Sequence, residues 1–412
     1  MAARTEVGPE QIEAARAAVS AEYTRTPSLR LPAIDELLGG PIALKAENLQ
    51  QSGSFKIRGA SFKLASLGED CSRGVVAGTA GNHGRALAYA ARRRDLRCEL
   101  FVPDDAPISK TEPAAELGAK LQRCEGTVDD CVALALERAE SEGLAFVHPF
   151  DDPDVIAGQG TVGLELLEDA PDLAKVLVPL GGGGLAAGIA IAVKSQRPEV
   201  EVVGVQVESC PSYVISLAEG QPVTVSPEST VADGIAVKRP GELTMPLIER
   251  WVDEVIVVSE DEVADAMAAL LSEAKLMVEG AGAVAVAALE SGRQSPASKG
   301  MTAVVLSGGN VDESLLAAIA RRSGARHGRG AILFTTISDR PGSLAQLLEA
   351  VGTTGASVVD VQHVRDVVDL HVGETGVELT LETRDYEHTN AIVAELGERG
   401  YKVKRQHSAR DD

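Results

Sequence analysis

Residues 176–193, with the sequence VLVPLGGGGLAAGIAIAV, join a short apolar run, four consecutive glycines (Gly181–Gly184) and an alanine-rich segment. The apolar run predicts a strand buried on both faces, and the alanines favour a helix. Glycines between a strand and a helix let phosphate oxygens approach backbone amides at the positive end of the helix. The stretch therefore predicts a strand, a phosphate-binding turn and a helix; a flexible turn without a ligand is the alternative.

The same alternation extends from about residue 74 to residue 321. It predicts strands at Val75–Ala77, Glu99–Val102, Phe146–His148, Val176–Leu180, Glu201–Val207, Val255–Val258 and Ala303–Leu306, and helices at Gly84–Arg94, Asp129–Ser141, Val155–Glu168, Leu185–Val193 and Glu262–Ala274. We expect an α/β fold with a mostly parallel sheet and helices on both faces. Ligands of such sheets bind at the carboxyl ends of the strands.

The sequence changes character near residue 322. Residues 322–330 are glycine-rich and basic, which predicts a linker. Beyond it we expect strand Ile332–Ile337, helix Ser343–Val351, strands Ser357–Val364 and Val372–Glu382, helix Glu387–Glu398 and strand Tyr401–Val403. This βαββαβ order is typical of ferredoxin-like domains.

Composition excludes several classes of protein. The 412 residues include 61 acidic and 39 basic side chains, so the net charge of −22 disfavours nucleic acid as a partner. No uncharged apolar run approaches the ~18 residues that span a bilayer, so we expect no membrane association. Five cysteines without a CxxC pair argue against a disulfide framework and for a reducing, cytoplasmic location.

A second informative stretch is SGSFKIRGA, residues 52–60, which places Lys56 between a small-residue loop and a helix-like segment. A lysine held in this way can form an imine with a carbonyl compound, which is covalent catalysis by an amine. The alternative is a solvated lysine at the start of a helix.

Two further loops follow expected strands. Residues 78–84 (GTAGNHG) open a helix, so their amides can bind an anion, and Asn82 can pair with a ring substituent. Residues 307–310 (SGGN) place the Ser307 hydroxyl at the same edge of the sheet. Each loop alone fits an ordinary turn or cap. Together, the four loops suit an aromatic aldehyde with a phosphate tail, for which pyridoxal phosphate is the natural candidate.

These motifs resemble a known family. GSFKIRGA, TAGNHG, PLGGGGLAAG and LSGGN, in this order, are similar to motifs of the fold-type II pyridoxal-phosphate enzymes, and most similar to those of threonine dehydratases (threonine ammonia-lyases). KAENLQ at 45–50, HPFDD at 148–152, GQGT at 158–161 and VADGIAV at 231–237 fit the same group. The likeness covers roughly residues 10–320. It implies two mostly parallel open sheets in a catalytic domain at 1–321, with a small subdomain at about 50–150 inserted in the large one.

The resemblance also implies roles for individual residues. Lys56 carries pyridoxal phosphate and acts as the catalytic base, and Phe55 packs near the cofactor ring. Asn82 bonds the 3-oxygen of the ring, Ser307 meets the pyridine nitrogen, and the phosphate sits on Gly181, Gly182, Gly183 and Gly184. The substrate carboxylate sits on the loop Thr79, Ala80, Gly81, Asn82 and His83. The expected reaction is β-elimination of L-threonine, and of L-serine, to a 2-oxo acid (2-oxobutanoate from threonine) and ammonia.

The tail, residues 331–405, resembles an ACT domain, the small regulatory fold that binds amino acids. The turn Asp339, Arg340, Pro341 and Gly342 stands where that fold places its ligand loop. The resemblance implies an effector such as isoleucine or valine, and a homodimer or homotetramer. A dimerisation module without a ligand is the alternative.

Two departures from the motifs of this family limit the reactions and ligands that we expect. Serine racemases of this fold have a serine directly before Gly-Asn-His, and this chain has Ala80, which disfavours racemisation. The stretch after Glu208 offers no second carboxylate, so we expect no divalent-metal site. One alternative is β-elimination or β-replacement on another hydroxyamino acid, such as hydroxyaspartate or phenylserine. Another is a non-catalytic amino-acid sensor. A third is a nicotinamide oxidoreductase, but this chain lacks the glycine fingerprint of that class.

Overall fold

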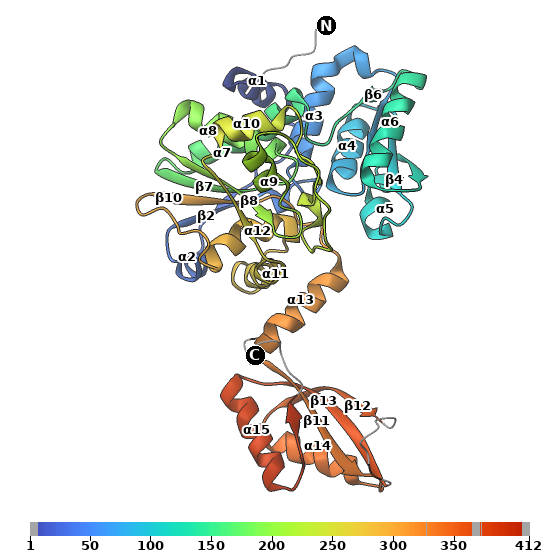
Figure 1. Cartoon of the computed structure of the whole chain (residues 1–412), viewed down its shortest axis with the longest axis vertical. Coiled ribbons are helices and arrows are strands. Elements are labelled where there is room, and N and C mark those ends of the chain that lie inside the picture. The colour runs from blue at the N-terminus through green and yellow to red at the C-terminus, as the bar shows by residue number, and fades with distance from the viewer. Residues whose placement is uncertain (1–6, 327, 365–370, 372, 406–412) are drawn as a thin grey trace. The chain divides into compact units, whose positions relative to one another are not determined.

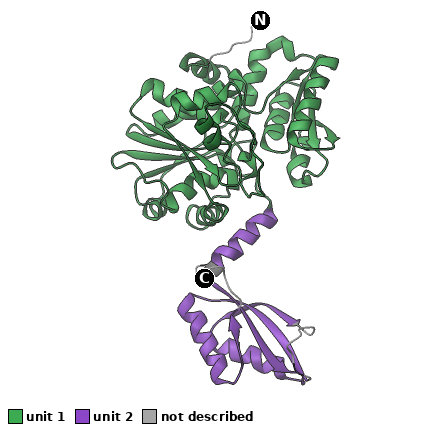
Figure 2. Cartoon of the chain, in the orientation of Figure 1, with its two compact units in different colours: residues 1–312 green, residues 313–412 purple. Residues whose placement is uncertain are grey.

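The computed structural model describes residues 7–326, 328–364, 371 and 373–405 (Figure 1). The chain divides into two compact units, Met1–Asp312 and Glu313–Asp412 (Figure 2). The boundary falls before helix α13 (Glu313–Arg326), which covers the first part of the stretch 322–330. Leucine, alanine and arginine in this segment favour a helix and outweigh the single Gly324, so a helix stands where we expected a linker to begin.

The larger sheet of the first unit is almost entirely parallel, as the sequence predicts. Its strand order is β1-β2-β10-β7-β8-β9. The strands are β1 (Ser28–Leu29), β2 (Ile42–Ala46), β7 (Leu173–Pro179), β8 (Glu201–Val207), β9 (Glu254–Val258) and β10 (Met301–Leu306). Only the edge strand β1 runs antiparallel to its neighbour, and both of its residues are partly exposed.

A smaller parallel sheet is inserted between β2 and β7. Its order is β5-β4-β3-β6, and the strands are β3 (Val75–Gly78), β4 (Cys98–Pro103), β5 (Lys120–Cys124) and β6 (Ala145–Phe146). Its residues lie within the segment 50–150 for which we expect a subdomain. The sequence did not predict β5, because this edge strand is polar and half exposed and lacks the apolar run of a buried strand.

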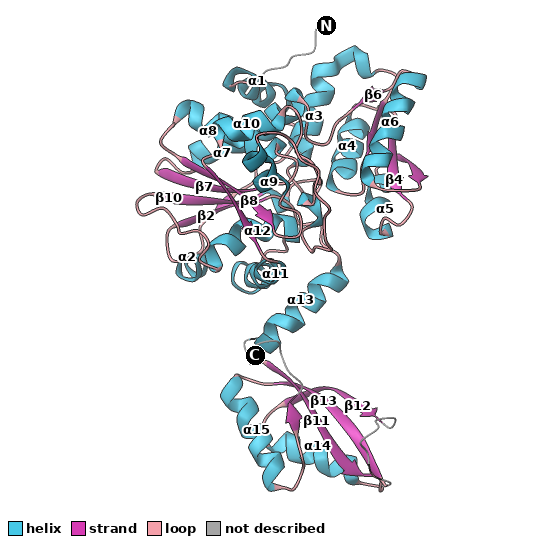
Figure 3. Cartoon of the chain, viewed as in Figure 1, coloured by secondary structure: helices cyan, strands magenta, loops and turns pink. Residues whose placement is uncertain are grey.

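Helices cover both faces of the larger sheet, with α7 and α8 on one face and α2, α11 and α12 on the other (Figure 3). The helices of the first unit are α1 (Pro9–Val19), α2 (Pro32–Leu38), α3 (Lys56–Leu67), α4 (Asn82–Arg93), α5 (Ile108–Glu116), α6 (Val128–Glu142), α7 (Pro153–Asp169), α8 (Gly184–Gln196), α9 (Ser212–Glu219), α10 (Thr244–Trp251), α11 (Glu260–Ala269) and α12 (Gly280–Glu290). No described helix is long and apolar enough to cross a membrane.

A buried ionic cluster holds α3 against the larger sheet. The Arg58 guanidinium donates to both carboxylate oxygens of Glu47 at 2.7 and 2.9 Å, and to both of Glu165 at the same two distances. Lys45 adds a 2.7 Å ion pair to Glu165. Burial opposes the charge on Glu47, but the Arg58 guanidinium lowers the pKa of that carboxyl overall. The motif KAENLQ and the arginine of GSFKIRGA therefore serve, at least in part, to position the helix that begins at Lys56.

The cysteines follow the expectation only in part. Cys71, Cys98 and Cys210 are free and buried. Cys124 and Cys131, seven residues apart, form a disulfide that joins the end of β5 to the first turn of α6. The odd cysteine count could not predict this local bridge, because it depends on how β5 and α6 meet.

The second unit has the expected βαββαβ order. Its elements after α13 are β11 (Gly330–Ser338), α14 (Ser343–Thr353), β12 (Ser357–Val364), β13 (Glu374–Glu382), α15 (Tyr386–Glu398) and β14 (Lys404–Arg405). The four strands form an antiparallel sheet in the order β12-β13-β11-β14. The last strand lies after Tyr401–Val403 because the Tyr401 amide still bonds the end of α15 at Leu396. Val372, where we expected β13 to begin, lies outside the described residues.

Candidate active site

Lys56 is the first residue of α3 and stands at the carboxyl edge of both sheets. Its Nζ donates to the Pro149 carbonyl at 2.7 Å and lies 5.2 Å from the centre of the Phe55 ring. Burial lowers the pKa of Lys56 to about 8, although Glu279 works in the opposite direction. A buried amine with such a pKa is neutral more often than a solvated lysine, as a nucleophile or base requires.

The tetraglycine turn is connected to Lys56 through the segment Pro149–Phe150. A Cβ at Gly182 would lie 2.2 Å from Cγ of the Phe150 ring. Gly183 has a left-handed backbone, with φ of 91°, and a Cβ there would lie 2.1 Å from the Tyr213 hydroxyl oxygen. Only glycine fits both positions.

The amides of this turn are available to a ligand. Gly184 begins α8, so the turn lies at the positive end of a 13-residue helix. In the part of the chain that the structure describes, no acceptor meets the N–H groups of Gly181, Gly182, Gly183 or Gly184. Four free amides at a helix N-terminus form an anion-binding turn.

The Ser307 loop packs directly on the lysine loop. The Phe55 amide donates to the Ser307 carbonyl at 3.1 Å, and Ser54 forms an isolated bridge with Gly308. Ser307 is 97% buried, and among the described residues its hydroxyl makes only a 3.5 Å bond to the Ala281 carbonyl, so it can turn to another partner. The Ser54 hydroxyl is fully buried and has no partner among the described residues.

Asn82 begins α4 and joins the small sheet to the rest of the site. Its Nδ2 donates to Oε1 of Glu279 at 2.6 Å, and its Oδ1 accepts from Nδ2 of Asn310 at 2.6 Å. Asn310 also accepts from the Arg85 guanidinium at 2.6 Å. Asn82 keeps one further N–H for a ligand, since its amide nitrogen carries two.

The loop 79–83 has free amides at its end. The Thr79 amide is bonded to the Phe101 carbonyl, and the Gly81 amide makes a long 3.3 Å bond to the Thr79 hydroxyl. No partner meets the amides of Ala80, Asn82 and His83 among the described residues. These three, more than Thr79, are therefore available to a substrate carboxylate.

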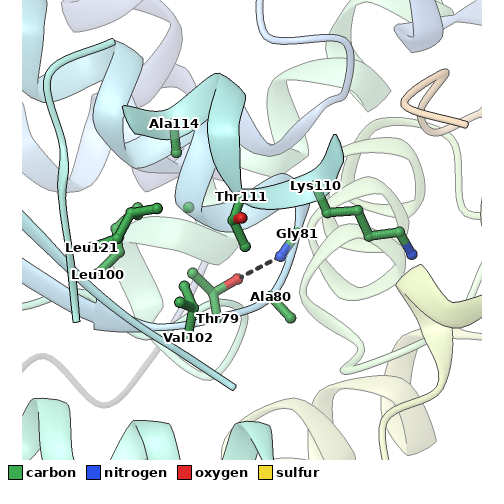
Figure 4. A pocket seen from close by; sticks show the side chains of 10 residues that line it. Thr79, Ala80, Gly81, Leu100, Val102, Lys110, Thr111, Ala114 and Leu121 are labelled. Atoms are coloured by element: carbon green, nitrogen blue, oxygen red, sulfur yellow. Dashed lines mark hydrogen bonds between the residues drawn. The ribbon is translucent and has the colours of Figure 1, made fainter. Parts of the chain in front are cut away.

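The loop 79–83 has a polar contact at His83 on one side and a small cavity on the other. His83 is turned inward, where its Nε2 lies 2.9 Å from the Val147 carbonyl and burial lowers its pKa to about 3, so the ring is neutral. Behind the loop, Figure 4 shows a small cavity with an apolar wall that includes Leu100 and Leu121, while the Lys110 side chain extends away from it. Lys110 forms an ion pair with Asp233.

Sequence reasoning missed Glu279, which precedes α12 and is 91% buried. Burial raises its pKa to about 7, against the opposing effects of Asn82, Lys110 and Lys56. One signal could have found it: Glu279 is the single charged residue in the apolar stretch 276–289. Phe150, Tyr213 and Asn310 were also not assigned roles, because their contacts are made only in the folded chain.

The chain is similar in sequence to known proteins. Residues 19–309 match the family described as pyridoxal-phosphate dependent enzyme. The chain belongs to this family. It is 44% identical to an L-threonine ammonia-lyase from Thermotoga maritima over 396 residues, which cover 96% of this chain and 98% of the relative.

Solved structures are also similar to this chain. The processed form of threonine deaminase isoform 2 from Solanum lycopersicum has a TM-score of 0.70 and 31% identity, and the match covers 77% of this chain and 94% of that one. The maize serine racemase has a TM-score of 0.73 and 33% identity, and the match covers 78% of this chain and 99% of that one. Because a deaminase and a racemase share this fold, the fold alone does not decide between these reactions.

The residues of this family member fit pyridoxal phosphate. Four free amides face a site that a methyl group at Gly182 or Gly183 would disturb, and the buried Ser54 hydroxyl lacks a protein partner among the described residues. The loops of Lys56, Asn82 and Ser307 are linked to one another through Phe55, Glu279 and Gly308. The turn Asp339–Gly342 lies in the other compact unit, between β11 and α14, where its four residues are exposed.

Proposed function

We propose that this chain is an L-threonine ammonia-lyase, which converts L-threonine to 2-oxobutanoate and ammonia and also accepts L-serine. The observation that carries the proposal is the meeting of the four loops around Lys56, in a chain that aligns almost end to end with an L-threonine ammonia-lyase. Pyridoxal phosphate, when bound, supplies an electron sink for the pair released from the Cα–H bond of the substrate.

The residues of the site bind the cofactor, bind the substrate and move the proton. Lys56 would hold the cofactor, Phe55 would pack beside the ring, the amides of Gly181–Gly184 would bind the phosphate, and Asn82 and Ser307 would bond the ring's polar atoms. The substrate carboxylate lies on the free amides of the 79–83 loop. Lys56 takes the Cα proton as general base, and its lowered pKa of about 8 increases the fraction of the amine that is neutral near neutral pH.

The reaction balances without an oxidant or reductant. The substrate loses the Cα proton and the Cβ hydroxyl as one water molecule. The dehydrated product then takes up one water molecule and releases ammonia, so threonine and 2-oxobutanoate differ by ammonia alone. Ala80 carries no hydroxyl that could return a proton to the opposite face of Cα, which favours elimination over racemisation.

The test is a Lys56→Ala variant assayed with threonine beside the wild type. We expect 2-oxobutanoate and a visible cofactor band only from the wild type, and a borohydride-trapped adduct on Lys56. Turnover of hydroxyaspartate or phenylserine without turnover of threonine would move the substrate to another hydroxyamino acid. A wild type without cofactor band or adduct would instead favour the amino-acid sensor.

We also propose that the second unit is an ACT-like regulatory domain that binds a branched-chain amino acid, isoleucine or valine, at the turn Asp339–Gly342. The βαββαβ order supports this proposal, as does the exposed turn before α14, where Gly342 has φ of 93°. The alignment with the Thermotoga maritima relative includes this unit. A homodimer or homotetramer stays a prediction.

Two variants test the regulatory proposal. A chain that ends after Asp312 and an Arg340→Ala variant are assayed with and without isoleucine or valine. We expect both to keep threonine turnover and to lose the response to the effector. An unchanged response in the shortened chain would refute the proposal.

A further inference from the structure

Glu279 occupies a defined place at the end of a four-member hydrogen-bonded chain. The Arg85 guanidinium donates to Asn310, Asn310 donates to Asn82, and Asn82 donates to Glu279, each at 2.6 Å. The first member is a cation and the last is a carboxylate. The hydrogen bonds therefore all run in one direction, from Arg85 to Glu279.

We infer that Glu279 is a positioning residue that fixes the orientation of the Asn82 amide and so leaves one Asn82 N–H for the ring oxygen of the cofactor. This inference rests on the proposed function. It assigns a role to Glu279, which has none in the proposed reaction, since Glu279 acts through Asn82 and not on the reacting atoms.

The argument depends on which groups can donate. An ionised carboxylate only accepts hydrogen bonds, whereas an asparagine amide has one accepting and one donating end. A flipped Asn82 would place its oxygen against the Glu279 carboxylate and its NH2 group against the NH2 group of Asn310. Both contacts are repulsive, so the observed orientation is the favoured one.

Asn310 cannot easily follow such a flip, because each end of its amide is held. Its oxygen accepts from Arg85, and its Nδ2 also reaches the Ser52 carbonyl at 3.1 Å. Arg85 is always charged and cannot accept a hydrogen bond. The orientation of Asn82 is thus set from both sides, by a fixed donor and by the Glu279 acceptor.

The backbone keeps Glu279 in place. Its amide donates to the Gly308 carbonyl at 3.1 Å, and its Oε1 lies 2.2 Å from where a Cβ at Gly308 would stand. Gly308 follows Ser307, so the same loop supports Glu279 and carries the serine proposed for the pyridine nitrogen. Glu279 therefore links two of the three side chains proposed to touch the ring.

The charges around Glu279 make its effect depend on pH. Lys56 from α3 and Lys110 from α5 face it and favour its ionised form, and Lys110 is itself paired with Asp233. Burial opposes these cations and raises the pKa of Glu279 to about 7. Below that pH the carboxyl gains a proton, becomes a weaker acceptor, and holds the Asn82 amide less firmly.

The experiment is a double-mutant cycle on cofactor affinity, measured by titrating the full-length cofactor-free chain with pyridoxal phosphate and following the visible band. The variants are Glu279→Ala, Glu279→Gln, Asn82→Ala and the double variant Glu279→Ala/Asn82→Ala. Glu290→Ala, at the exposed far end of α12, is the matched control. Thermal melts show whether each variant is folded.

We expect Glu279→Ala to weaken affinity about tenfold, the size of one lost charge-assisted hydrogen bond, and Glu279→Gln, which keeps an acceptor, to weaken it less than about threefold. In the Asn82→Ala background, Glu279→Ala should weaken the affinity for pyridoxal phosphate no further. Wild-type affinity should fall more steeply below about pH 7 than that of Glu279→Gln, because both chains share the titration of Lys56 and only the wild type loses the Glu279 carboxylate. Glu290→Ala should match the wild type.

If Glu279→Ala weakens cofactor affinity equally in the wild-type and Asn82→Ala backgrounds, the inference is overturned, because Glu279 then acts independently of the amide. An unchanged affinity in Glu279→Ala would also overturn it, as would a pH profile that Glu279→Gln does not alter. A wild type that binds pyridoxal phosphate but does not convert threonine would refute the proposed function alone, since the cycle measures only cofactor affinity.

Discussion

The Phe150 ring lies against Gly182, so that a Cβ on the glycine would be 2.2 Å from the ring carbon Cγ. Phe150 follows Pro149, whose carbonyl accepts the hydrogen bond from Lys56. Two consecutive residues thus set the lysine and the tetraglycine turn in relation to each other. A cofactor that joins an aldehyde to a phosphate requires this kind of fixed spacing between an amine and an anion site.

This contact predicts that Gly182→Ala weakens cofactor binding. The added methyl group must displace either the ring or the turn, and overpacking of this kind costs ~1–3 kcal/mol, or about 5- to 150-fold in affinity if the turn moves. Titration with pyridoxal phosphate measures the loss. Gly324→Ala, where nothing lies within 4 Å of the new Cβ, is the control and should bind as the wild type does. Equal affinity in Gly182→Ala would contradict the proposed phosphate turn.

A second prediction concerns Ala80. Ala80→Ser adds a hydroxyl directly before Gly81, where serine racemases of this fold have their serine. A positioned acid or base contributes ~10²–10⁴-fold to proton transfer, so we expect at least a hundredfold rise in formation of D-serine from L-serine. Chiral chromatography of the products measures it. Ala80→Gly adds no proton donor and should form no D-serine; if Ala80→Ser forms none either, the serine alone does not make a racemase.

A third prediction follows from the buried amine. Burial lowers the pKa of Lys56 from 10.5 to about 8, so its reaction with pyridoxal phosphate should become half-maximal near pH 8. The folded chain then binds fewer protons than the unfolded one between pH 8 and 10.5. This group alone therefore makes folding more favourable as pH rises through that range.

Borohydride trapping of the cofactor-free chain at a series of pH values, followed by peptide mass spectrometry, measures this pKa. Lys63 on the same helix is the internal control. Burial opposes its charge, but its ion pairs with Asp152 and Asp154 raise its pKa overall. Lys63 should react only at higher pH. Equal pH profiles for the two lysines would show that the pKa of Lys56 is not lowered.

The sequence predicted the parts of this fold that depend on local patterns. The strand, turn and helix of residues 176–193 appear as β7, the tetraglycine turn and α8 because apolar runs, glycines and alanines act over a few residues. The contact between Asn82 and Glu279 joins residues 197 positions apart, and no local pattern encodes it. The Cys124–Cys131 bridge and the polar edge strand β5 escaped prediction for the same reason: each depends on tertiary neighbours.

The last prediction concerns the stability of the first unit. Arg58 is fully buried between Glu47 and Glu165, so Arg58→Met would leave buried Glu47 without its ion-pair partner and Glu165 with Lys45 alone. Breaking a buried pair in this way costs ~3–5 kcal/mol in the free energy of unfolding. Urea denaturation measures it, and Arg16→Met, whose side chain is 39% exposed, should cost at most about 1 kcal/mol.

The pH dependence of Arg58→Met distinguishes lost charge pairing from lost packing. In the wild type Arg58 lowers the pKa of Glu47, so this carboxyl contributes stability above the unfolded pKa of 4.5 that is lost as pH falls. Without Arg58, the Thr26 hydrogen bond and Lys45 still oppose burial, but burial is the largest effect, so we expect the pKa of Glu47 to rise. The variant should then become less stable as pH rises above 4.5, and Glu47→Gln in the same chain should flatten that dependence. If the variant and the wild type change with pH in the same direction, the cluster stabilises α3 by packing and not by charge.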